Sequence, residues 1–194
     1  HDMSNPTIKS ISKLAAQWQT PDPFLFCAFH FDHFPKGNGK LGPATGLSGR
    51  SIGQDFSGKD GWSMYHGQEV PGFPGHPHRG FETVTIALQG MVDHSDSLGG
   101  TGRFGDGDTQ WMTAGKGVQH SEMFPLIHEE KENPLLLFQI WLNLPKKSKM
   151  VNPYYGMMWS EETPHVYIKD AHERQTDVQL IAGSLNGQQA LAPS

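Results

Sequence analysis

The feature that most constrains the fold is a run of short β-type segments between residues 81 and 144, separated by glycine-containing turns. The segments are "FETVTIALQG", "MVDHSDS", "GDTQWMTAG", "KGVQHSEMF" and "PLLLFQIWLNL" (134–144). β-Branched and aromatic residues are frequent in them, and no helical period of apolar residues interrupts the series. Short strands at such close spacing are typical of a sandwich or a barrel. The sequence therefore predicts an all-β protein.

Weaker patterns lie on either side of that run. Residues 8–18 predict a short helix or an irregular arm, and the long, aperiodic segment 35–61 predicts a cover on the scaffold or a mobile segment. Further strands are predicted at "FLFCAFHFDHF" (24–34), "GWSMYHG", "HVYIK" and "VQLIAGSL". The glycine-rich "GGTGRFGDG" lacks the lysine and hydroxyl residue of a phosphate-binding loop and is interpreted as a hairpin turn. The opening "HDM" is interpreted as a cloning remnant.

Composition and charge argue against several partners. The formal net charge is -5 and there is no long Lys/Arg run, so nucleic acid is not expected as a ligand. No apolar run reaches the ~18 residues of a membrane span, so no membrane contact is expected. Cys27 is the single cysteine, so no internal disulfide can form, and with no leader at the start this indicates a cytoplasmic protein. Cys27 itself is expected to be a buried apolar residue.

Two pairs of residues carry the candidate chemistry. His76 and His78 are separated by one residue, and His120 and Glu122 repeat that spacing about 40 residues later. On an extended backbone, residues i and i+2 point to the same side. Two such pairs on neighbouring strands can converge on one point inside a barrel. Three imidazoles and a carboxylate suit Fe, Ni, Cu, Zn or Mn, and they leave coordination positions open for a substrate.

Other polar residues compete with this set or accompany it. Glu82 lies four residues after His78, so it could also face inward and take the place of the carboxylate. His94 is interpreted as a polar residue of a strand or turn rather than a ligand. In "PLLLFQIWLNL", Gln139, Trp141 and Asn143 alternate with apolar residues, so a strand places all three on one face.

Four segments resemble the pirin family of the cupin superfamily: "HPHRGFETVT", "HSDSLG", "GDTQWMTAGKGVQHSEM" and "FQIWLNLPKKSKMVNP". The resemblance runs from about Pro23 to the last residues, and it is closest to bacterial members that carry "GRSIGQDFSGKDGWSMYHG". It implies a bicupin, in which two jelly-roll barrels (double-stranded β-helices) follow each other and the first holds the metal. We therefore expect an N-terminal metal-binding pirin cupin domain at 4–150 and the start of a truncated C-terminal cupin domain at 151–194.

The resemblance also implies metal ligands, and they fall on the same positions that the two-residue spacing indicates. The family's HPH histidines fall on His76 and His78, and its HxE pair falls on His120 and Glu122. Ordinary cupins use a glutamate shortly after the first pair, whereas pirins use the carboxylate of the HxE pair. Glu82 is therefore expected beside the site, bonded to a ligand imidazole. The remaining candidates for the pocket or its surroundings are Phe81, Gln139 and Trp141.

Members of the family are associated with iron and with quercetin 2,3-dioxygenase activity, which opens the flavonol heterocycle with O2 and releases carbon monoxide. The chain is thus expected to bind one divalent metal ion, iron ahead of Ni, Cu, Zn or Mn. Its expected substrate is a small aromatic compound such as a flavonol, with Glu122 as the catalytic proton acceptor. One alternative is a non-enzymatic, metal- or redox-sensing regulator that binds a protein partner. Another is a closed structural zinc site.

The C-terminal segment carries an expectation of its own. A jelly roll needs about eight strands, and the chain from Thr163 onward is too short for one. It is also too apolar to stay free in water. These residues are therefore expected to pair as strands with the first barrel, or with a second copy of the chain in a homodimer.

Overall fold

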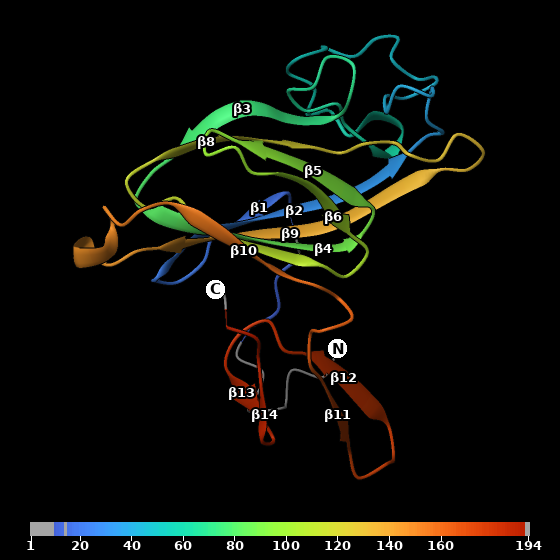
Figure 1. The fold of residues 1–194 in the computed structure, drawn as a ribbon. Helices are drawn as coiled ribbons and strands as arrows, with labels where there is room; N and C mark the ends of the chain where they lie inside the picture. The colour runs from blue at the N-terminus through green and yellow to red at the C-terminus, as the bar shows by residue number, and fades with distance from the viewer. Residues whose placement is uncertain (1–9, 14, 193–194) are drawn as a thin grey trace.

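The chain is built almost entirely from antiparallel β-strands, as Figure 1 shows for the computed structural model, which describes residues 10–13 and 15–192. The strands are β1 Gln17–Trp18, β2 Phe24–Phe34, β3 Gly72–His78, β4 Phe81–Gln89, β5 Met91–Asp96, β6 Thr101–Gly105, β7 Thr109–Thr113, β8 Val118–Met123, β9 Asn133–Asn143, β10 Tyr154–Met158, β11 His165–Lys169, β12 Gln175–Gln179, β13 Ser184–Leu185 and β14 Gln188–Gln189. Two 3-10 helices, η1 Lys59–Gly61 and η2 Lys146–Ser148, complete the described elements. Within these residues, no helix has the length and hydrophobicity required to span a membrane.

Two facing sheets form the main body. The larger has the strand order β1-β2-β9-β4-β7-β10, and the smaller has the order β3-β8-β5-β6. Because side chains alternate along a strand, Leu135 and Leu137 of β9 share the inner face with Ala87 of β4. The core between the sheets contains Phe34, Trp62, Met64, Tyr65, Ala87, Val92, Phe104, Phe124, Leu126, Leu135 and Leu137. The predicted all-β jelly-roll class is confirmed.

Most predicted strands are present, but three local predictions are wrong. "VQLIAGSL" is not a single strand, because its first two residues end β12 and its last two form β13. "GWSMYHG" forms no strand, because Tyr65 has a φ of 56° and makes only isolated bridges to Asp55 and Gly72. "GGTGRFGDG" is more than a turn, since β6 lies inside it and pairs with β5. A cross-strand ion pair supports that pairing, with Arg103 Nε 2.6 Å from Asp93 Oδ1.

Two predictions for the N-terminal part of the chain, the burial of Cys27 and the helix or arm at 8–18, have different outcomes. Cys27 of β2 is buried, as expected, and burial raises the pKa of its thiol. The predicted helix or arm at 8–18 lies in part outside the described residues, namely at 8, 9 and 14. Its remaining residues are irregular up to β1, which pairs with β2.

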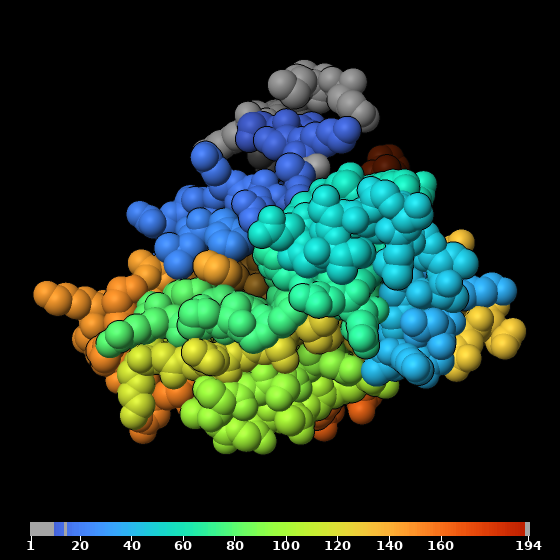
Figure 2. Space-filling view, turned by 90° about the horizontal axis from the view of Figure 1, so that it is seen from above, coloured from blue at the N-terminus to red at the C-terminus, as the bar shows by residue number. Residues whose placement is uncertain are grey.

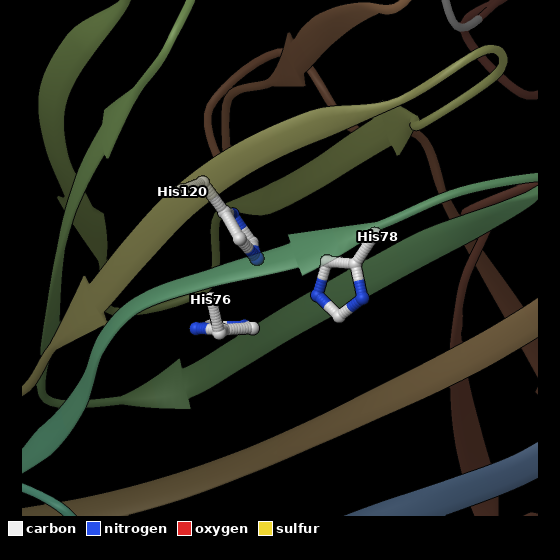
Figure 3. A group of neighbouring side chains, drawn as sticks. All are labelled: His76, His78 and His120. Atoms are coloured by element: carbon white, nitrogen blue, oxygen red, sulfur yellow. The ribbon is translucent and has the colours of Figure 1, made fainter.

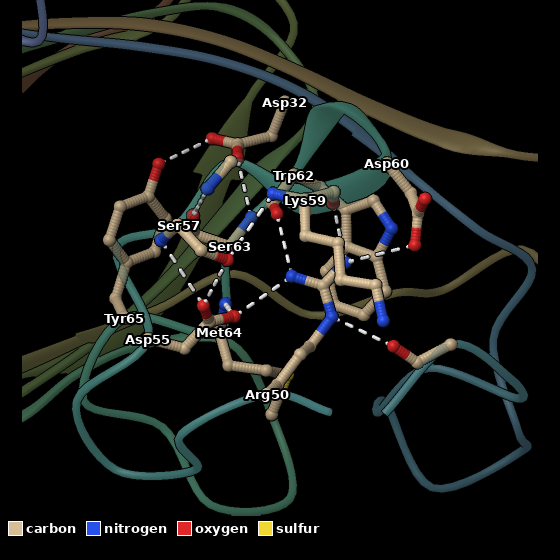
Figure 4. Close-up of polar contacts among 12 residues, drawn as sticks. Asp32, Arg50, Asp55, Ser57, Lys59, Asp60, Trp62, Ser63, Met64 and Tyr65 are labelled. Carbon is tan, nitrogen blue, oxygen red and sulfur yellow. Dashed lines mark hydrogen bonds and ion pairs between the residues drawn. The ribbon is translucent and has the colours of Figure 1, made fainter. Parts of the chain in front are cut away.

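The segment between β2 and β3, residues 35–71, packs against one end of the sheets, and we call it the cover segment. Trp62, Met64 and Tyr65 anchor it in the core. Figure 4 shows the polar network that ties it together around Arg50. The buried guanidinium bonds to Asp55 Oδ2 at 2.9 Å and to the Trp62 carbonyl at 2.8 Å. The predicted cover is therefore a packed element of the fold.

The C-terminal residues do not pair with the barrel as expected. β10 extends the larger sheet by pairing with β7, but β11 pairs with β12 and β13 pairs with β14. Val166, Leu180 and Ala190 close a small apolar cluster among these hairpins. In each hairpin the two strands form hydrogen bonds with each other. The predicted pairing of these strands with the first barrel is therefore wrong. The domain division at 150 and the exchange with a second copy stay predictions.

Candidate metal centre

Three histidines from adjacent strands gather at one mouth of the barrel. His76 of β3 and His120 of β8 are direct register partners, and His78 lies two residues farther along β3. One ring nitrogen of each lies within 4.8 Å of those of the other two, and Figure 3 shows the rings turned toward a common point. The register shifts between Phe73 and His76, an irregularity of the kind that re-aims side chains at sites.

The environment keeps two of these imidazoles neutral. Burial, followed by the neighbouring His120 and His76, lowers the pKa of His78 to about 3. Burial, followed by His76 and His94, lowers the pKa of His120 to about 3. A neutral imidazole is the form that binds a metal ion. These two rings are therefore ready to act as ligands near neutral pH.

Unpartnered nitrogens test whether a metal ion fits. His78 Nε2 and both ring nitrogens of His120 are buried without a hydrogen-bond partner among the described residues. A buried polar atom left in that state costs about 1–3 kcal/mol. His76 instead donates from Nδ1 to the Pro74 carbonyl at 2.9 Å, which leaves Nε2 bare toward the cluster. This donor set fits a divalent transition metal.

Glu122 of β8 lies beside the triad. Its Oε2 is 3.6 Å from His120 Nε2 and 4.0 Å from His76 Nε2. Gln139 Nε2 donates to the two carboxylate oxygens at 2.8 and 3.0 Å, and the Thr85 hydroxyl is 3.4 Å from Oε1. The carboxylate is thus held beside His76 and His120 by side chains of the opposite sheet.

Two residues of the polar-tipped face expected on β9, Gln139 and Trp141, lie in this site, whereas Asn143 accepts a hydrogen bond from Lys149. Trp141 Nε1 donates to Gln139 Oε1 at 2.9 Å, which turns the Gln139 amide hydrogens toward Glu122. Phe81 stacks on Trp141 with ring centroids 4.5 Å apart. Both aromatic rings are nearly perpendicular to the His78 ring, with ring centroids 5.0 Å from it. These three pocket candidates therefore surround the triad on its β9 side.

Glu82 bonds to no imidazole among the described residues, so that prediction is wrong. Its carboxylate accepts from Trp111 Nε1 at 3.0 Å and from the Thr113 hydroxyl at 2.8 Å, both on β7. Thr85, three residues along β4, reaches Glu122 and therefore faces the opposite side of the sheet. His94 is buried on β5 and bonds through Nε2 to Asp96 Oδ2 at 2.8 Å, in line with its interpretation as a polar strand residue.

A pocket of about 630 Å³ opens next to the triad. His76, His78, Glu122, Gln139 and Trp141 line one part of it. The rest is mostly apolar and aromatic, formed by Ala15, Ala16, Gln17, Phe26, Ala28, His30, Phe56, Tyr65, Phe73, Pro77, Phe124 and Leu137. Figure 2 shows the surface hollowed between the blue N-terminal arm, the cyan-to-teal cover segment and green β3. A second pocket of about 470 Å³, beside Leu126 and Asn133, holds none of the triad.

Two residues of this pocket were missed by the sequence interpretation. His30 of β2 bonds through Nδ1 to the Tyr65 hydroxyl at 2.9 Å, and Tyr65 donates to Asp32 at 2.7 Å. The only local signal is the alternation of β2, which puts His30 and Asp32 on one face of an otherwise aromatic strand. The contact with Tyr65 is not local, since 35 residues separate it from His30.

A two-sheet jelly roll with a histidine triad and an adjacent glutamate at its mouth defines a cupin. The chain belongs to the Pirin family, whose sequence model matches residues 8–142. The family resemblance and the cupin fold are both confirmed.

Named relatives agree with this placement. Pirin-1 of Arabidopsis thaliana is 47% identical over 116 residues, which cover 60% of this chain and 37% of that protein. Human Pirin is 48% identical over 101 residues, which cover 52% of this chain and 33% of that protein. The crystal structure of a quercetin 2,3-dioxygenase from Acinetobacter baumannii matches with a TM-score of 0.66 and 32% identity, over 89% of this chain and 49% of that one. The chain thus spans at most about half the length of these relatives.

Proposed function

We propose that the chain holds one divalent metal ion on His76, His78, His120 and Glu122, with iron as the expected ion. The observation that supports this most is the convergence of three imidazoles, two of which have buried ring nitrogens that lack partners among the described residues. Glu122 lies close enough to complete the set. Nitrogen and carboxylate donors of this kind also suit Ni, Cu, Zn and Mn.

The proposed reaction is the ring-opening dioxygenation of a flavonol. The name of the Acinetobacter baumannii relative supports this choice. The pocket volume of about 630 Å³ lies within the usual range of small-molecule sites, and its aromatic walls suit a planar ring system. When bound, the metal supplies open coordination positions at which substrate and O2 are activated.

The residues of the site divide the remaining work. Glu122 accepts the proton of the flavonol 3-hydroxyl on a carboxylate oxygen. Gln139 holds that carboxylate in place, and Trp141 fixes the orientation of the Gln139 amide. Phe81 and the aromatic walls exclude water from the reacting end. The reaction consumes flavonol and O2 in equal amounts and releases one CO, so it needs no further oxidant or reductant.

Metal analysis and turnover test this proposal. The metal content of freshly purified protein is measured first, and the protein is then loaded anaerobically with each of the five metals. Flavonol absorbance is followed before and after O2 is admitted, together with release of CO. We expect O2-dependent loss of flavonol with iron, abolished in Glu122→Gln and retained in the matched control Glu82→Gln.

Two results would overturn the proposal. Absence of O2-dependent turnover with every metal would favour the regulatory alternative over the enzyme. A metal-filled structure in which two of the four ligands point away would refute the metal site itself.

A further inference from the structure

A chain of three side chains runs from the interior of the protein to the far wall of the pocket. Asp32 Oδ1 accepts from the Ser63 backbone N–H at 3.0 Å, and its Oδ2 accepts from the Tyr65 hydroxyl at 2.7 Å. The Tyr65 oxygen lies 2.9 Å from His30 Nδ1. Figure 4 shows Asp32 and Tyr65 bonded at the base of the cover segment. His30 and Tyr65 both line the pocket, and the proposed function gives His30 no role.

Charge decides which way the protons point along this chain. Burial raises the pKa of Asp32 to about 6, so the carboxylate is still ionised at pH 7 and can only accept. Burial and the charge of Asp32 raise the pKa of Tyr65 far above neutral, so the phenol keeps its proton. An ionised acceptor makes the stronger bond, so the phenol proton points to Asp32. The Tyr65 oxygen must then accept a hydrogen bond from His30.

The direction of that bond fixes the tautomer of His30. Burial lowers the pKa of His30 to about 4, against the opposing charge of Glu122, so the ring is neutral and carries one proton. That proton is on Nδ1, where it is donated to Tyr65. Nε2 consequently carries a lone pair, and no described residue donates a hydrogen bond to it. The pocket therefore has a hydrogen-bond acceptor in its wall.

The acceptor lies apart from the histidine triad. In the register of β2 and β9, Ala28 faces Gln139 and His30 faces Leu137. Two residues along a strand correspond to roughly 7 Å, so His30 is displaced by about that length from the residue that holds Glu122. The Phe73 ring packs near both imidazoles, with its centroid 5.7 Å from that of His30 and 6.4 Å from that of His76. A planar ligand of two or three rings can span this distance.

We propose that His30 is a specificity-determining residue whose Nε2 accepts a hydrogen bond from a hydroxyl group of a polyphenol, at the end of the pocket away from the triad. Tyr65 and Asp32 are positioning residues that act through His30 by fixing its tautomer. The proposal rests on the proposed function only in taking a flavonol as the ligand. The lone pair favours ligands with a hydroxyl donor there and disfavours ligands that present a carboxylate.

Ligand binding without turnover tests the proposal. The Zn(II)-loaded chain is titrated under anaerobic conditions with quercetin and with 3-hydroxyflavone, which keeps only the 3-hydroxyl, and tryptophan fluorescence reports Kd. Wild type should prefer quercetin, and His30→Phe should reduce that preference roughly three- to tenfold, the worth of one hydrogen bond. The affinity for 3-hydroxyflavone should change little. The matched control is His33→Phe, an exposed residue of the same strand, which should alter neither Kd. Equal weakening of both ligands, or no change, would refute the role of His30.

A spectroscopic readout tests the tautomer independently of affinity. In 15N NMR of the Zn(II) form, His30 should show a protonated Nδ1 and an unprotonated Nε2, with its signals assigned by their absence in His30→Phe. In Asp32→Asn the amide can donate to Tyr65, so the phenol proton should turn to His30 Nδ1 and the ring proton should move to Nε2. The quercetin preference should fall as well. A protonated Nε2 in wild type would overturn the proposal. Because neither readout needs O2, a failed turnover assay leaves this test unaffected, and an active enzyme can still fail it.

Discussion

Replacement of Arg50 by Met should destabilise the protein through the cover segment. The Arg50 guanidinium is fully buried and lies 2.9 Å from Asp55 Oδ2. It also donates to three backbone carbonyls, those of Gly46, Lys59 and Trp62, at 2.6–2.8 Å, and it stacks 3.5 Å above the Trp62 ring. Arg50→Met keeps a long apolar stem but removes every one of these donors. The buried Asp55 carboxylate then loses its cation.

The expected loss follows from what Asp55 retains. Breaking a buried ion pair by removing one partner costs about 3–5 kcal/mol. Asp55 still accepts from Met64 N–H at 2.9 Å and from the Ser57 hydroxyl at 2.6 Å. Because these bonds partly satisfy the carboxylate, we expect the low end of that range, about 3 kcal/mol, out of a total of ~5–15 kcal/mol.

The substitution should also change how the stability of the fold depends on pH, through the Asp55 carboxylate. Burial alone raises the pKa of Asp55, but bonds from Met64, Ser57 and Arg50 overcome it and hold the pKa at about 2. In wild type this group therefore stabilises the fold above its ordinary pKa of 3.8, and the contribution is lost as the pH falls toward 2. In Arg50→Met the pKa of Asp55 should rise, so acid destabilisation through this group should shrink.

Urea unfolding measures both effects, and the chain offers a matched control. Arg103→Met removes an exposed ion pair with Asp93, whose Nε–Oδ1 distance is 2.6 Å, and should cost only about 0–1 kcal/mol. The double variant Arg50→Met with Asp55→Asn should recover part of the loss, because no buried charge is then left alone. If Arg50→Met proves no more destabilising than Arg103→Met, the network does not hold the cover segment and the reasoning fails.

Three further predictions concern the site, the interior and the tail. Gln139→Leu removes the donors to Glu122 and should weaken metal binding ~10–100-fold in chelator competition. Glu82→Gln should keep the metal. If Glu82→Gln loses the metal and Glu122→Gln does not, the roles of the two carboxylates are assigned in reverse. The pKa of Asp32 in the folded protein, about 6, lies above its ordinary value of 3.8. Wild type should therefore gain stability relative to Asp32→Asn as the pH falls from 6 to 4. A difference in urea midpoints that does not change with pH would contradict this. Amides of β11 and β12 should exchange faster than those of β4 and β9, since their pairing joins neither main sheet. If light scattering after size exclusion shows only monomer, strand exchange between copies is ruled out. If the amides of all four strands are equally protected from hydrogen exchange, the β11–β12 hairpin is not independent of the main sheets.

The spacing of residues within one strand was predicted reliably, because the two-residue period is a local property of the backbone. It placed His76 with His78, His120 with Glu122, and Gln139 with Trp141 on shared faces. The same logic failed for Glu82, which is separated from His78 by a turn at Gly80 with a φ of 78°. A turn between two strands changes which alternate residues face inward. An even spacing across the turn therefore does not show that two side chains lie on the same face.

Long-range contacts were not accessible to that reasoning. Nothing near His30 in sequence indicates that Tyr65 will meet it, because that contact depends on the path of the cover segment. Likewise, β6 was hidden by its glycines, and its pairing is stabilised by the partner strand β5 rather than by its own propensity. In each case the missing information is the identity of the residue's neighbour in space.

The Arg50 network also bears on the rate at which a ligand enters. The cover segment carries Phe56 and Tyr65, two walls of the pocket, and its buried bonds fix its path before any ligand arrives. A wall that had to become ordered on binding would lose about 1–2 kcal/mol of conformational free energy for each residue fixed. Since this wall is already ordered, no closing step should limit association. Observed rates should rise linearly with flavonol concentration, with a single exponential at each, and related ligands should differ mainly in how slowly they leave.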